Sequence, residues 1–164
     1  MATYKIWRSC VASPESVKKQ KKSLTLAVPQ QRPAGRNVMH RSRLGGIVID
    51  CRDANLDQAG TFWGGVFGYE ATRAPDPADT NYVELSGPPG ELHVLLQRVE
   101  HPSRVHLDIE TDDIEAEAAR LEGLGARRIE HIRDWLVMEA PTGHRFCLVP
   151  PQRDGFLEHA TVWP

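Results

Sequence analysis

The sequence of 164 residues lacks long apolar runs and a set of closely spaced cysteines. No apolar run approaches the roughly 20 residues that cross a bilayer, so we expect no contact with a membrane. Its three cysteines, Cys10, Cys51 and Cys147, have no short paired spacing and do not form a closed framework. A reduced, cytoplasmic setting is therefore the default expectation.

Motifs that cradle phosphate or expose a catalytic nucleophile are also missing. The chain has no GxGxxG, no GxxxxGK[ST], no GxSxG and no HExxH. Cys147 is the one candidate for covalent catalysis, and its activation would need a nearby base such as His106. The net charge of -2 gives no overall argument for nucleic acid as a partner.

Charge is distributed unevenly along the chain. Residues 1–43 hold ten Lys and Arg against one acid, whereas residues 44–164 hold ten Arg against twenty-one acids. Residues 1–43 have no sustained apolar period, so we interpret them as a basic, flexible extension. One explanation is an upstream-extended reading frame with the natural start near Met39. The other is a basic arm that touches an anionic surface, although no aromatic residues interleave its lysine cluster.

From Leu44 onward a strand, a helix and three further strands occur twice, with a period near 60 residues. Turn residues separate the strands, and a helix-capping side chain and a terminal glycine bound each helix. The first helix is capped around Asp53–Asn55 and stops at Gly68; the second is capped at Asp112–Asp113 and stops at Gly125. The predicted strands of the first copy are 44–51, 69–74, 81–85 and 92–99. Those of the second are a strand that begins at Arg104 and ends before the cap, then 126–132, 135–139 and 146–149.

The strand that opens the second copy carries a polar face. Side chains at i, i+2 and i+4 of a strand share a face, so His106, Asp108 and Glu110 point one way. If Gly46 of the first copy faces that side as well, Val48 and Asp50 do so too. Acids gathered there would raise one pKa, as acid–base catalysis requires. The alternative is that these carboxylates bond neighbouring arginines such as Arg104 and make the strands rigid.

The segment Leu44–Asp53, the Phe62–Gly68 helix end, His106–Ile114 and Pro141–Leu148 together resemble the vicinal oxygen chelate superfamily, in particular its small bacterial glyoxalase-like and bleomycin-resistance-type domains. The resemblance implies an α+β fold: two βαβββ modules, about 44–100 and 103–151, forming one open curved eight-stranded mixed sheet around a central cavity, with helices outside. Residues 152–164 would be a tail that packs on the domain or on a partner.

The resemblance also implies a divalent metal, held by one residue in the first strand and one in the last strand of each module. These positions fall on His106 and Cys147 in the second module, and on Gly46 and either Leu96 or Gln97 in the first. Gly46 has no side chain, so the predicted set is degenerate. His106 and Cys147 suit Zn, Ni, Mn or Fe better than Mg, although binding without any metal stays open.

Two functions therefore stand side by side: a lyase, isomerase or dioxygenase-type enzyme, and a non-catalytic protein that binds or sequesters a small molecule. In the enzyme, His106 acts as metal ligand or base with Asp108 and Glu110. In either, the predicted ligand-binding residues are Asp50, Gln97, Trp135, Met138 and Tyr82, with core packing as the alternative for the last three. The expected partners are a small polar organic molecule and a second copy of the chain, without nucleic acid.

Overall fold

The computed structural model describes residues 39–73 and 80–164. Most of the predicted basic extension, with Cys10, lies outside the described residues, as does the predicted turn around Pro75 and Pro77. No helix in the described ranges combines the length and the apolar character that crossing a bilayer requires.

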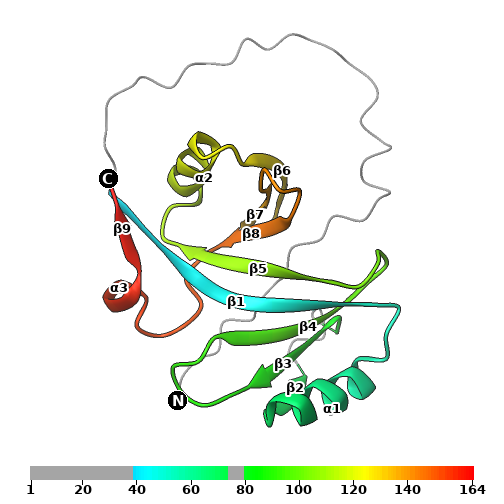
Figure 1. Cartoon of the computed structure of the whole chain (residues 1–164). Coiled ribbons are helices and arrows are strands. Elements are labelled where there is room, and N and C mark those ends of the chain that lie inside the picture. The colour runs from blue at the N-terminus through cyan, green and yellow to red at the C-terminus, as the bar shows by residue number, and fades with distance from the viewer. Residues whose placement is uncertain (1–38, 74–79) are drawn as a thin grey trace.

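The predicted repeat is present as two modules of identical element order (Figure 1). The first consists of β1 (His40–Arg52), α1 (Leu56–Phe67), β2 (Glu70–Arg73), β3 (Tyr82–Ser86) and β4 (His93–Val99). The second consists of β5 (Arg104–Thr111), α2 (Ile114–Gly123), β6 (Arg127–Ile132), β7 (Trp135–Glu139) and β8 (Arg145–Val149). A short helix α3 (Phe156–His159) and strand β9 (Thr161–Trp163) follow.

Local sequence signals set the ends of both long helices. The Asn55 side chain accepts hydrogen bonds from the amides of Asp57 and Gln58 at the start of α1. Gly68 ends that helix in the left-handed conformation with φ of 73°, which glycine adopts without a steric penalty. Asp113 caps α2 by accepting from the amide of Ala116. These side chains satisfy backbone groups that the helix itself leaves unpaired.

The two modules join edge to edge in one mixed sheet with the order β2-β3-β4-β1-β5-β8-β7-β6. β1 runs parallel to β4 and antiparallel to β5, and β5 in turn runs parallel to β8. The central pair β1–β5 thus belongs to both modules. The predicted architecture, two βαβββ modules in one mixed sheet with the helices outside, is observed.

β1 starts at His40, so residues 40–43 belong to the sheet and not to the predicted extension. The cause is β9, whose residues Thr161–Trp163 pair antiparallel with His40–Ser42. Under this pair, Glu117 of α2 accepts hydrogen bonds from Ser42 Oγ and pairs with His40 and Arg120. The tail after residue 151 therefore packs back on its own domain.

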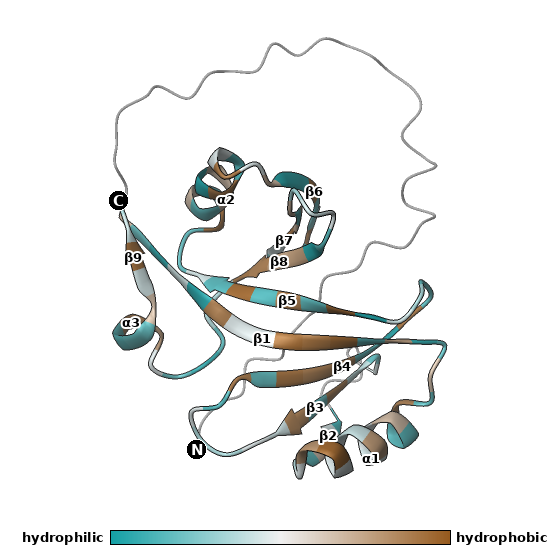
Figure 2. Ribbon diagram, viewed as in Figure 1, coloured by the Kyte–Doolittle hydropathy of each residue, from teal (hydrophilic) through white to brown (hydrophobic). Residues whose placement is uncertain are grey.

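Strand alternation separates two faces of the sheet. Ile49, Leu85 and Leu96 pack under α1, and Leu136, Met138 and Leu148 pack near α2. The other face, which we call the inner face, carries a separate apolar cluster that includes Val48, Leu95, Trp135, Val137 and Cys147. Hydrophobic colouring runs along the middle of β1 in Figure 2, consistent with packing on both of its sides. The polar side chains predicted for the site lie on the inner face.

Candidate functional site

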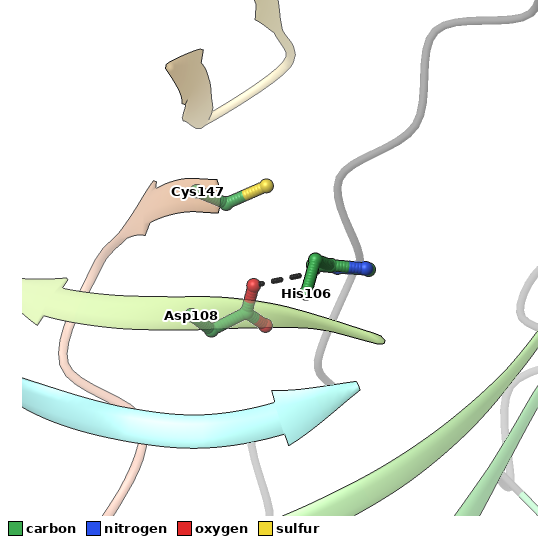
Figure 3. A group of neighbouring side chains, drawn as sticks. All are labelled: His106, Asp108 and Cys147. Carbon is green, nitrogen blue, oxygen red and sulfur yellow. Dashed lines mark ion pairs between the residues drawn. The ribbon is translucent and has the colours of Figure 1, made fainter. Parts of the chain in front are cut away.

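One imidazole lies between two buried carboxylates near the centre of the inner face. His106 Nδ1 is 3.1 Å from Asp50 Oδ2, and its Nε2 is 3.7 Å from Asp108 Oδ1. Figure 3 shows the side chains of His106 and Asp108 next to each other on β5, with Cys147 of β8 nearby. The exposed fractions of Asp50, His106 and Asp108 are 1%, 2% and 0%. The contact between Asp50 and His106 joins the two modules.

Asp50 is surrounded by cationic and donor groups at its Oδ2 atom. Arg104 Nε donates to that oxygen at 3.1 Å, and His101 Nε2 lies 3.6 Å from it. Arg104 faces Asp50 directly in the β1–β5 ladder. The alternative interpretation of Asp50 as a partner of Arg104 is thus correct for this contact, and the same oxygen also contacts His106.

Asp108 has a different environment. Neither of its carboxyl oxygens has a hydrogen-bond partner among the described residues. Burial raises the pKa of Asp108 from 3.8 to about 7; the neighbouring His106 opposes this rise, and the charges of Asp50 and Glu110 add to it. A carboxyl group with such a pKa can exchange a proton near neutral pH, which is the property of a general acid or base.

Cys147 completes a group of three possible metal ligands. It faces Asp108 in the β5–β8 ladder, and ligand atoms of His106, Asp108 and Cys147 all lie within 4.8 Å of one another. Imidazole, carboxylate and thiolate together suit zinc and similar divalent ions. Cysteine binds a metal ion as the thiolate. The three-residue set therefore fits a metal in the reduced protein.

The cross-strand register aligns a row of residues over the inner face. Gly46 pairs with His93 on one side and with Asp108 on the other, and Asp108 pairs with Cys147. Neighbouring strands lie about 4.8 Å apart. Because Gly46 has no side chain, β1 puts no group between His93 and Asp108 in this row.

Glu110 lies on the same face but makes structural contacts. Its Oε2 accepts from Arg43 Nε at 2.7 Å, and its Oε1 accepts from the amides of Gln152 and Arg153 at 3.0 and 2.9 Å. Both oxygens are therefore satisfied, and Glu110 ties the chain after β8 to β5. Its predicted catalytic role stays a prediction without a contact that supports it.

The predicted ligand-binding residues divide between the two faces. Gln97 pairs with Asp50 across β1–β4 and donates to Tyr82 Oη at 3.3 Å, so both belong to the inner face. Of the two candidates for the metal-ligand position in β4, Gln97 is the one on the inner face, because Leu96 packs under α1. Trp135 also lies on the inner face, whereas Met138 belongs to the cluster near α2. Met138 is three residues after Trp135, and alternation turns it away from the predicted ligand.

Two cavities adjoin these elements. One of about 440 Å³ is lined by residues of the β3–β4 hairpin, including Glu84 and His93, and by Gln152 and Arg153. Burial, the largest influence, lowers the pKa of His93. The other, of about 520 Å³, lies between β5, α2 and β9 and includes Val105, Leu107 and Trp163. Among the described residues, Asp108 and Cys147 line neither of these two cavities.

Sequence reasoning missed three basic residues in this region. His101 lies between two predicted strands and Arg43 in the predicted extension, although both contact buried carboxylates of the inner face. Arg153 lies in the predicted polar tail but donates to the carbonyl of Gly45. The Arg104 contact with Asp50, in contrast, was among the alternatives that the sequence suggested.

Comparison with known proteins agrees with this architecture. A family model described as a glyoxalase-like domain matches residues 46–149. The crystal structure of methylmalonyl-CoA epimerase from Mycobacterium tuberculosis is similar with a TM-score of 0.52 and 18% identity, over 67% of this chain and 88% of that one. A hypothetical protein from Bacillus halodurans C-125 is similar with a TM-score of 0.52 and 13% identity, over 70% of this chain and 97% of that one.

No curated protein matches the sequence. At these identities the solved structures support the fold and not a particular activity. The family model, in contrast, runs from Gly46 within β1 to Val149 at the end of β8 and so extends over both modules. The chain belongs to the glyoxalase-like domain family.

Proposed function

We propose that the chain is an enzyme that binds a small polar organic molecule against the inner face and moves a proton with His106 and Asp108. The observation that carries the proposal is the arrangement of one imidazole between two buried carboxylates, with both Asp108 oxygens lacking a hydrogen-bond partner in the described ranges. A buried polar group without a partner costs roughly 1–3 kcal/mol. A bound substrate with a hydroxyl or an acidic C–H group would offset that cost.

The row of paired residues supports a place for this ligand. Gly46 contributes no side chain on β1 between Asp108 and His93, which lines the 440 Å³ cavity. A molecule that enters beside His93 would reach Asp108 along this row. Gln97 of β4 and Tyr82 of β3 lie in the cross-strand row that contains Asp50. There an amide and a phenol can orient a polar ligand.

A metal ion fits the same residues in the reduced protein. His106, Asp108 and Cys147 would hold it, and the ion would act as a Lewis acid on an oxygen of the ligand. His106 and Asp108 orient and exchange protons with a ligand whether or not the ion is bound. Their burial excludes water from the reacting atoms and strengthens every charge interaction among them.

The second candidate is a binding protein without catalysis. Gly46, at the expected ligand position of the first module, favours it, because a divalent site that draws on one module has fewer protein donors. The apolar cluster around Trp135 and Val137 would then serve as the wall of a binding site. Binding without turnover is the outcome that identifies this candidate.

We also propose a homodimer. Val105 and Leu107 are 56% and 41% exposed, and with Leu44 they form an apolar strip on the side of the sheet away from the inner face. This strip borders the 520 Å³ cavity. A second copy of the chain would cover this strip. Sedimentation at micromolar protein concentration measures whether the mass in solution is that of one chain or of two.

Proton transfer can be tested with a defined panel of 2-oxo acids, 2-hydroxy acids and carboxylic thioesters in D₂O. Proton NMR would follow the loss of the C–H signal next to the carbonyl. We expect exchange with at least one class, and a loss of about 100-fold or more in His106→Gln and Asp108→Asn. His131→Gln changes an exposed histidine on β6 and serves as the matched control.

The same protein samples, reduced, would be offered Zn, Ni, Mn and Fe(II) in turn, and bound metal would be counted by elemental analysis. If His106→Gln leaves the rate of C–H exchange unchanged, the proposed enzymatic function is refuted. Binding of a panel member without exchange would favour the non-catalytic candidate instead.

A further inference from the structure

The atom Oδ2 of Asp50 has three nitrogen neighbours within the protein. Arg104 Nε and His106 Nδ1 each lie 3.1 Å from it, and His101 Nε2 lies 3.6 Å away. The carboxyl group is 1% exposed. Asp50 is thus held from three sides, by β5 and by the loop between β4 and β5, before any ligand arrives.

These contacts determine which nitrogen of His106 carries a proton. An ionised carboxylate has no hydrogen to donate, so the 3.1 Å contact requires a hydrogen on Nδ1. In the neutral ring, Nε2 then has the lone pair, and Nε2 is the nitrogen that faces Asp108 at 3.7 Å. A ring held in this tautomer presents a base, or a metal ligand, toward Asp108 and the centre of the inner face.

We infer that Asp50 is the positioning residue of the site: with Arg104 and His101 it fixes the orientation and the Nδ1–H tautomer of His106. Asp50 acts through His106 and has no need to touch the substrate, in contrast to the ligand-binding role that its place in the sequence suggested. Arg104 and His101 act one step further away, because they hold Asp50.

The inference rests on the proposed function for its catalytic consequence but not for its structural content. The tautomer exists in the protein without a ligand. The two ideas can therefore fail separately: turnover tests the proposed function, and the spectrum of the imidazole tests the positioning role.

The test uses long-range proton–nitrogen correlation NMR on the full chain labelled with ¹⁵N, at about pH 9, where an imidazole is neutral. The His106→Gln variant identifies the His106 signals by their disappearance. In the wild type we expect Nδ1 of His106 to carry a hydrogen and Nε2 to be unprotonated. Asp50→Asn should lose this single pattern, because its amide can also donate a hydrogen to Nδ1.

Asp108→Asn is the matched control, because it changes the carboxylate at the Nε2 side and leaves the Nδ1 contact in place. It should keep the wild-type pattern. If a panel substrate turns over, Asp50→Asn should lower kcat by about 10- to 100-fold with little change in KM, as for other groups that orient a functional histidine.

Three results would overturn the inference. They are a wild-type ring protonated at Nε2, an unchanged pattern in Asp50→Asn, and a KM effect of Asp50→Asn without a kcat effect. Should Asp50→Asn fail to fold, the wild-type spectrum alone still decides the tautomer. Absence of turnover in the wild type would refute the proposed function and leave the tautomer result standing.

Discussion

Replacing Asp108 by asparagine should raise the free energy of unfolding above that of wild type. The increase should be larger at pH 8 than at pH 5. Asparagine has the same shape as a protonated aspartate but does not ionise. The pKa of Asp108 is raised by burial from 3.8 to about 7, and one pKa unit corresponds to about 1.4 kcal/mol. Keeping this carboxylate ionised in the folded state therefore costs about 4 kcal/mol.

The sign follows from proton binding. Between about pH 4 and pH 7 the unfolded chain has released the Asp108 proton while the folded protein retains it. The folded state binds more protons in this window, so the contribution of Asp108 to stability falls as pH rises. The cost is about 1.5–2 kcal/mol at pH 5 and about 4 kcal/mol at pH 8, so the gap between variant and wild type widens by roughly 2–3 kcal/mol.

Urea unfolding of both proteins at pH 5 and pH 8 measures this gap. Asp134→Asn, an exposed acid in the turn before β7, is the control and should change stability by less than about 0.5 kcal/mol at either pH. A gap that stays constant between the two pH values would mean that Asp108 is ionised in the folded protein at pH 5. The acid–base role would then lose its support from burial.

Two further predictions concern the packing of α1 and the tie between Glu110 and the tail. In Gly64→Ala of α1, the added Cβ would lie 2.8 Å from the Tyr69 carbonyl oxygen, so we expect a loss of about 1–3 kcal/mol in urea unfolding. Gly65→Ala, one residue later, meets nothing within 4 Å and should stabilise α1 by up to about 1 kcal/mol; equal effects would contradict this packing. Glu110→Gln should cost about 3–5 kcal/mol, because it leaves buried Arg43 without its carboxylate. It should also speed proteolysis after residue 150, and unchanged cleavage would argue against the tie to the tail.

The fold was predictable because its signals are local. Asn55, Gly68 and Asp113 bound the helices through contacts with residues two to four positions away. Strand alternation groups His106 with Asp108, and Asp50 with Gly46, without any knowledge of tertiary contacts. The resemblance then predicted that both groups face the same cavity. The predicted limits of β7, 135–139, coincide with the observed strand because turn residues flank it on both sides.

The site was less predictable because its contacts are distant in sequence. Arg43 and Glu110 are 67 residues apart, and nothing in the local pattern distinguishes an arginine in a basic extension from one in a buried ion pair. The start of β1 at His40 depends on β9, more than 100 residues later. Met138 is a different case, since alternation from Trp135 would already have excluded it from the inner face.

The pairing of β1 with β5 has a consequence for the origin of this site. Asp50 comes from one half of the duplicated chain and His106 from the other, so neither half expressed by itself would contain the pair. An ancestral single module could have brought them together only by associating with another copy. Fusion of two modules would have made the encounter intramolecular, and afterwards each half was free to keep a different member of the pair.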